Sequence, residues 1–131
     1  MGERAVGAST SEERRRPPLE LLRFKELYDA GQFWHAHEAL EGLWRATADS
    51  ALATLYRGMI QLAAAYLHLE RGNLRGGARL LRKAASSLLG CPPDHATVRA
   101  DLLVERIRSS LAAVEAGAVA APPALPLTEN D

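Results

Sequence analysis

The sequence predicts an all-α protein, an up-and-down bundle of about five helices. Apolar residues recur every three or four positions over several long stretches, which is the spacing of one helix face. Glycine, asparagine and proline interrupt the chain between these stretches, and no segment shows the alternation expected of a strand. The predicted loops are short, so consecutive helices are expected to lie antiparallel as neighbours.

The first predicted helix covers residues 19–30 and follows Pro17 and Pro18, because proline is tolerated in the first turn of a helix. Gly31 is expected to end this helix in a left-handed conformation. A second helix is predicted over residues 33–47.

The third predicted helix, residues 51–71, is the longest and the most apolar, so we expect it to be central and buried. Asp49 or Ser50 is expected to cap its start by accepting a hydrogen bond from a free backbone amide. Gly72 and Asn73 are expected to end it.

A fourth helix is predicted over residues 74–89, and the sequence Gly-Cys-Pro-Pro at 90–93 is a strong stop signal. Asp94 is a suitable cap for a fifth helix, which is predicted over residues 96–116. The segments that begin at Leu27 and Leu69 share a pattern of apolar residue, glycine and helix, which favours hairpins of the tetratricopeptide kind.

The chain is expected to fold as one helical domain, residues 17–116. Residues 1–16 are small and charged without periodicity, and we expect a disordered arm there. Residues 117–131 are rich in alanine, proline and acidic residues, and we expect a flexible tail.

The composition points to a soluble protein of the cytoplasm. Acidic and basic residues balance at 16 each, which argues against a nucleic-acid or anionic-membrane partner. Cys91 is the single cysteine, so no internal disulfide and no cysteine-rich metal site can form. The N-terminus lacks the apolar core of a secretory signal, and no apolar run is long enough to cross a bilayer.

Polar and aromatic side chains form a stripe on the second predicted helix. His37 and Glu41 are four residues apart and lie one turn from each other, with Trp34 and Trp44 on the same side. Polar side chains on an otherwise buried face must pair with one another or form a site, because an unpaired buried charge is costly.

The third predicted helix carries Gln61 and His68 at a spacing of seven, which also places them on one face. If the second and third helices pack antiparallel, this face could meet the stripe on the second helix. His37, Glu41 and His68 would then supply two imidazoles and a carboxylate, a ligand set suited to zinc, iron or manganese.

The alternative is a purely structural role for these residues. Glu41 can pair with Arg45 one turn on, and both histidines can be hydrogen-bonded core residues. The sequence fixes no reaction, so it leaves open whether the protein is an enzyme, and it also leaves open the oligomeric state.

A basic face is predicted on the fourth helix. No acidic residue occurs between Arg71 and Pro93, and the basic residues there are Arg71, Arg75, Arg79, Arg82 and Lys83. This face could receive a phosphate group or an acidic partner helix, or it could simply be a solvated surface.

Three blocks of sequence, GQFWHAHEALEGLWR, RGMIQLAAAYLH and RGNLRGGARLL, resemble the domain-of-unknown-function family 309 in that order. The resemblance implies a compact helical fold and no established activity. It also implies that the polar positions of the family correspond here to His37, Glu38, Glu41, Trp44, Gln61, His68, Gly72 and Asn73.

Two hypotheses follow for the function. The first is a polar pocket between helices that binds a small polar ligand or a divalent metal through His37, Glu38, Glu41, Trp44, Gln61, His68 and Asn73. The alternative is a helical-hairpin module that binds a protein partner, with a polar core that has only a structural role.

Overall fold

The computed structural model describes residues 17–92, 98–119 and 121–127. This part of the chain contains five helices, and their bounds are as follows: α2 (Leu19–Asp29), α3 (Phe33–Ala46), α4 (Ser50–Glu70), α5 (Leu74–Leu89) and α6 (Ala100–Glu115). The one β feature among these residues is an isolated antiparallel bridge between Val98 and Leu127. The all-α prediction is confirmed.

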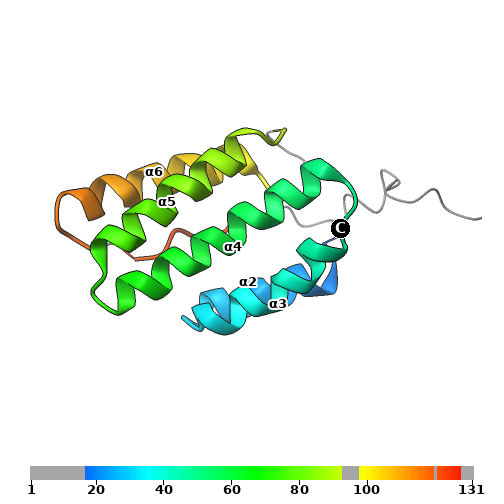
Figure 1. Ribbon diagram of the computed structural model, residues 1–131, viewed down its shortest axis with the longest axis horizontal. Helices are drawn as coiled ribbons and strands as arrows, with labels where there is room; N and C mark the ends of the chain where they lie inside the picture. The colour runs from blue at the N-terminus through cyan, green and yellow to red at the C-terminus, as the bar shows by residue number, and fades with distance from the viewer. Residues whose placement is uncertain (1–16, 93–97, 120, 128–131) are drawn as a thin grey trace, which may run out of the picture.

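Each helix packs against the next helix along the chain, which is the arrangement of an up-and-down bundle. In Figure 1, α4, α5 and α6 lie side by side, and α3 lies beside α4 with α2 behind it. Of the described helices, none is both long enough and apolar enough to cross a membrane. The detailed likeness to tetratricopeptide hairpins stays a prediction.

Helix α4 is the central element, as the sequence predicts. It packs against α3 on one side and α5 on the other, and it is apolar around most of its circumference. Its buried residues are Leu52, Leu55, Tyr56, Gly58, Met59, Leu62, Ala63, Ala65, Tyr66 and Leu69. A helix that is apolar on nearly all sides is stable only when neighbours cover it, which explains why α4 lies in the interior.

The contact between α4 and α5 depends on glycines. A Cβ atom at Gly58 would lie 2.8 Å from Cγ of Leu88, and one at Gly77 would lie 2.3 Å from Cδ2 of Leu69. Both distances are far shorter than carbon atoms tolerate. The two helices can therefore approach this closely only because these positions lack side chains.

The residues predicted to end or cap the helices do so in the structure. Gly31 and Gly72 have φ values of 77° and 81°, so each supplies the left-handed residue that follows a helix. Asp49 caps α4, since its Oδ1 accepts from the amides of Ala51 at 3.0 Å and Leu52 at 3.1 Å.

The prediction for the last helix is wrong at its start. Helix α6 begins at Ala100, because Val98 pairs with Leu127 and the amide of Arg99 donates to the carbonyl of Pro126 at 3.0 Å. These contacts hold the chain extended where the sequence predicts helix. Asp94, the predicted cap, lies outside the described residues.

Part of the chain after Gly117 contacts the bundle, and the flexibility expected of residues 117–131 stays a prediction. Residues 121–127, which we name the C-terminal strap, run back along the bundle from the end of α6 (Figure 1). Pro123 and Leu125 in the strap are buried. The predicted disorder of residues 1–16 and the tail at 128–131 lie outside the described residues.

Candidate functional site

The residues of the predicted polar site lie on both sides of α4. Gln61 faces α5, where its side-chain oxygen accepts a hydrogen bond from the hydroxyl of Ser87 at 2.8 Å. The predicted stripe of histidine, glutamate and tryptophan lies on α3, which packs against α4 from the other side. The side chain of Gln61 thus forms a hydrogen bond between α4 and α5.

His68 and Asn73 are brought together at the turn between α4 and α5. Oδ1 of Asn73 accepts from the amide of Gly76 at 2.9 Å and so caps α5. The side-chain nitrogen Nδ2 of Asn73 lies 3.0 Å from Nδ1 of His68, and this nitrogen can only donate a hydrogen bond. Nδ1 of His68 is therefore the acceptor, and the imidazole orients the side chain that caps the helix.

The α3 residues have mostly local partners. Glu41 pairs with Arg45 at 3.4 Å, and Glu38 lies 3.8 Å from Nδ1 of His35, both on the surface. The ring of His37 packs against Trp34 with centroids 5.4 Å apart, and Nδ1 of His37 is buried without a hydrogen-bond partner. Trp44 packs against the edge of the apolar core.

Within the described residues, no three His, Cys, Asp or Glu side chains come close enough together to hold a metal ion. The structure therefore brings His68 and Asn73 together, but it does not gather His37, Glu41 and His68 as a ligand set. Metal binding by these residues stays a prediction.

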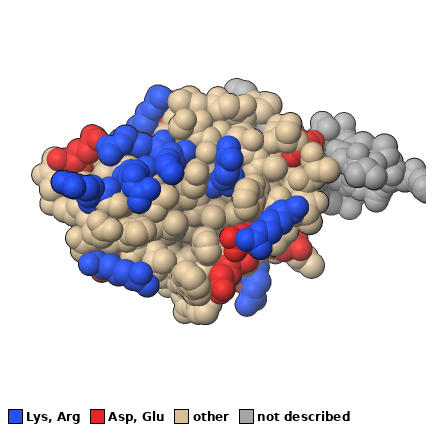
Figure 2. Space-filling view, viewed as in Figure 1, with Lys and Arg blue, Asp and Glu red and all other residues tan. Residues whose placement is uncertain are grey.

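The basic face predicted on the fourth helix is exposed. Figure 2 shows Lys and Arg side chains gathered toward the left of the face that α4 and α5 present. Arg82 is already paired with Glu115 of α6 at 2.8 Å, with both side chains 54% exposed. An exposed pair of this kind contributes little to stability. Binding of a phosphate group or an acidic partner by this face stays a prediction.

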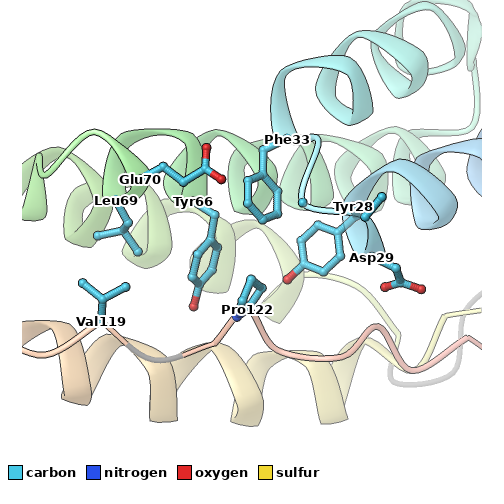
Figure 3. A pocket seen from close by; sticks show the side chains of 10 residues that line it. Tyr28, Asp29, Phe33, Tyr66, Leu69, Glu70, Val119 and Pro122 are labelled. Atoms are coloured by element: carbon cyan, nitrogen blue, oxygen red, sulfur yellow. The ribbon is translucent and has the colours of Figure 1, made fainter.

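A cleft that the sequence did not predict lies where the ends of α2 and α4 meet the C-terminal part of the chain (Figure 3). Its volume is about 390 Å³. Its lining residues are Tyr28, Asp29, Ala30, Gly31, Phe33, Tyr66, Leu69, Glu70, Val119 and Pro122. We name it the aromatic cleft.

Three buried aromatic rings form the floor of the aromatic cleft. Phe33 meets Tyr28 edge-on with centroids 5.5 Å apart and lies 5.8 Å from the ring of Tyr66. In Figure 3 both tyrosines extend toward the segment that carries Pro122. Contacts of this geometry between aromatic rings are favourable and fix the rings relative to one another.

The two tyrosine hydroxyls have different surroundings. The hydroxyl of Tyr28 donates to the carbonyl of Pro123 at 2.8 Å, whereas the hydroxyl of Tyr66 is buried and has no partner in hydrogen-bonding geometry. Burial raises the pKa of Tyr66, and the nearby Ser110 side chain lowers it to a smaller extent. Burial also raises the pKa of Tyr28, as do its neighbours Tyr66 and Asp29, so both phenols are neutral near pH 7.

The C-terminal strap is held on the bundle mainly through its backbone. Besides Tyr28, the guanidinium of Arg106 on α6 donates to the carbonyl of Ala124 at 2.8 Å. The strap thus links the end of α2 to the side of α6, and its side chains at 123 and 125 are buried while those at 122 and 124 are exposed.

The sequence contained a weak signal for this site. An apolar pattern typical of an extended segment lies near the end of the chain, at Pro122, Pro123, Leu125 and Leu127. This pattern does not indicate which surface of the bundle the segment covers. Tyr66 is spaced like a core residue on α4, and its position gives no sign that its hydroxyl lacks a partner.

Comparisons with known proteins find two similarities, and both are to proteins described as of unknown function or uncharacterized. A protein from Aquifex aeolicus (strain VF5), described as uncharacterized, is 32% identical over 76 residues, which is 57% of this chain and 23% of that protein. The chain thus matches about a quarter of the relative's length. No solved structure matches the chain.

The model of the family described as "Domain of unknown function (DUF309)" matches residues 21–80, which run from α2 into the first half of α5. The aromatic floor of the cleft lies within this match, while the strap and α6 lie outside it. The resemblance noted in the sequence is thereby confirmed over residues 21–80, where the chain is similar to the DUF309 family.

Proposed function

We propose that this chain is a helical protein-interaction module, and that it binds an extended, proline-containing polypeptide segment at the surface which the C-terminal strap covers. The observation that carries this proposal is the way in which the strap itself is bound. Side chains of α2 and α6 hold two consecutive backbone carbonyls of the strap, those of Pro123 and Ala124.

This mode of binding is typical of peptide recognition. The domain contacts the backbone of an extended segment through hydrogen bonds, and alternate side chains enter the surface. Here Pro123 and Leu125 are buried, and the exposed Ala124 lies between them. Proline lowers the conformational entropy that an extended segment loses on binding, because its φ angle is already restricted.

The positions of the predicted polar residues also favour an interaction module over a polar pocket. Gln61 bonds to Ser87 and His68 bonds to Asn73, so both already have protein partners. A ligand that bound to either side chain would have to replace a hydrogen bond within the bundle.

Release of the strap in the full chain provides a test. Leu125→Asp places a carboxylate at a buried site and should detach the strap, and circular dichroism would check that the helices remain. A labelled peptide with the sequence of residues 118–131 should then bind to this variant at least tenfold more tightly than to the wild type, in which the strap competes. Fluorescence anisotropy measures both affinities.

A matched peptide that carries the same Leu125→Asp change is the control, and it should bind at least tenfold more weakly than the natural sequence. Equal binding of the natural peptide to both proteins, or binding to neither, would contradict the proposal.

A further inference from the structure

We propose that the aromatic cleft binds a primary ammonium group, carried either by a free alkylamine or by a lysine side chain. The cleft is present when the strap is in place, because Val119 and Pro122 form one wall, and it borders the surface that the strap covers, since Tyr28 contributes to both. Four features of its lining point to an organic cation.

The first feature is charge. Two ionisable carboxylates, Asp29 and Glu70, line the aromatic cleft, and no basic side chain lines it. Asp29 is bound by Lys25 of the same helix, so its charge is partly balanced. Glu70 has no ion-pair partner among the described residues, and it is exposed at the rim. It is therefore available to a cation.

The second feature is the orientation of two helices. Helix α2 ends at Asp29 and α4 ends at Glu70, so the carboxyl ends of both helices meet at the cleft. The aligned peptide dipoles place partial negative charge at this end of a helix and favour a nearby cation. The last turn of α2 contains no basic residue that would offset this charge.

The third feature is the aromatic floor. The rings of Tyr28, Phe33 and Tyr66 form a contiguous set, with neighbouring centroids 5.5 and 5.8 Å apart. Aromatic faces attract cations, and the attraction is stronger where water is excluded.

The fourth feature is the hydroxyl of Tyr66, which is independent of the other three. Tyr66 is only 3% exposed and its side chain lines the cleft, and its buried hydroxyl lies near the Ser110 side chain but makes no hydrogen bond of suitable geometry. Figure 3 shows this hydroxyl between Val119 and Pro122. A neutral phenol oxygen accepts hydrogen bonds, so it can receive one N–H of an ammonium group.

These features together favour a primary ammonium group on a short alkyl chain. Such a group has three donors, enough for the carboxylate of Glu70 and the oxygen of Tyr66, and Leu69, Val119 and Pro122 offer apolar contacts for the chain. The volume of about 390 Å³ is near the lower end for small-molecule sites. A metal ion fits less well, because the described residues supply no group of three ligands.

Titration of the wild-type chain, followed by NMR of the backbone amides, tests the proposal with four probes. These are n-butylammonium, the amide of Nα-acetyl-lysine, n-butanol as the neutral analogue, and tetramethylammonium as a cation without donors. We expect saturable shifts at the amides of Tyr66 and Glu70 with at least one of the two primary amines. Their relative affinity identifies the free amine or the lysine side chain as the preferred source. The butanol and tetramethylammonium affinities should be at least tenfold weaker.

Two variants locate the interaction. Glu70→Gln and Tyr66→Phe should each weaken binding of the primary amine at least fivefold, while Glu105→Gln, an exposed acid on α6, should leave it unchanged. The proposal is overturned if neither amine gives saturable shifts, if butanol or tetramethylammonium binds as tightly, or if Glu105→Gln weakens binding as much as Glu70→Gln. Because the strap stays bound throughout, these outcomes do not depend on the peptide-binding proposal.

Discussion

The two sides of α4 differ in how completely they are filled. Toward α5, glycines allow the helix backbones to come close, and the polar side chains of Gln61, His68 and Asn73 all have partners. Toward α2, α3 and the C-terminal part of the chain, bulky aromatic rings keep the elements apart and the aromatic cleft remains between them.

The same difference appears in the unpaired polar atoms. Among the described residues, the buried side-chain atoms without a hydrogen-bond partner are Nδ1 of His37 and the hydroxyl of Tyr66, and neither lies on α5. A buried polar group without a partner destabilises a fold, so it is a better indication of binding than a polar group that is already paired. The comparison teaches that polar residues predicted as a site can be paired within the bundle, while a buried hydroxyl without a partner lies beside a cleft lined by aromatic residues.

The largest effect is expected where α4 and α5 are closest. Gly77→Val should lower the free energy of unfolding by about 3 kcal/mol, since overpacking of a well-packed contact costs roughly this much. The new Cβ would meet the buried side chain of Leu69 and lie 3.3 Å from the carbonyl oxygen of Ala65. Urea denaturation followed by circular dichroism measures the change.

Gly42→Ala is the matched control, because a Cβ at this exposed position of α3 meets no atom within 4 Å. Alanine favours helix over glycine, so this variant should be more stable by about 0.5–1 kcal/mol. If Gly77→Val were as stable as the wild type, the close approach of α4 and α5 would not depend on glycine.

A smaller, pH-dependent effect is expected from the tyrosines. Burial raises the pKa of Tyr28, Tyr56 and Tyr66, and that of Tyr56 rises to about 12. In the unfolded chain these phenols ionise near pH 10, so the unfolded state holds fewer protons above that pH and unfolding becomes easier. The stabilisation from Tyr56 should be complete below about pH 10 and should be lost as the pH rises toward about 12.

Urea midpoints measured at pH 9, 10 and 11 at constant ionic strength test this dependence. Each buried tyrosine should lower the free energy of unfolding by up to about 1.4 kcal/mol per pH unit above pH 10. Tyr56→Phe should make the decline less steep. An unchanged slope in this variant would show that Tyr56 does not remain protonated in the fold.

The smallest of the three effects is expected at the cap of α5. Asn73→Ala removes the acceptor for the amide of Gly76 and should lower the free energy of unfolding by about 1 kcal/mol. Asn73→Asp keeps the acceptor and should retain most of the stability. If Asn73→Ala also changed the affinity of the aromatic cleft for an amine, the conclusion that the two sides of α4 act independently would be wrong.

Much of the fold could be predicted because it depends on neighbours in sequence. The apolar spacing on α4, the left-handed glycines at 31 and 72 and the cap at Asp49 are local features, and the structure contains all of them. The sequence also predicted that the polar residues on α3 and α4 would pair with one another or form a site, and Gln61 and His68 do have side-chain partners. It could not identify those partners, because spacing along one helix does not reveal which neighbouring helix a face meets.

The sequence by itself therefore determined the helices, most of their ends and their order in the bundle. Tertiary structure alone decided that Gln61 and His68 face α5, that the strap lies between α2 and α6, and that Tyr66 is left without a partner. The physical reason is that helix formation follows from contacts three and four residues apart. The strap and the aromatic cleft instead depend on contacts across the chain, such as the one between Tyr28 and Pro123, which are 95 residues apart.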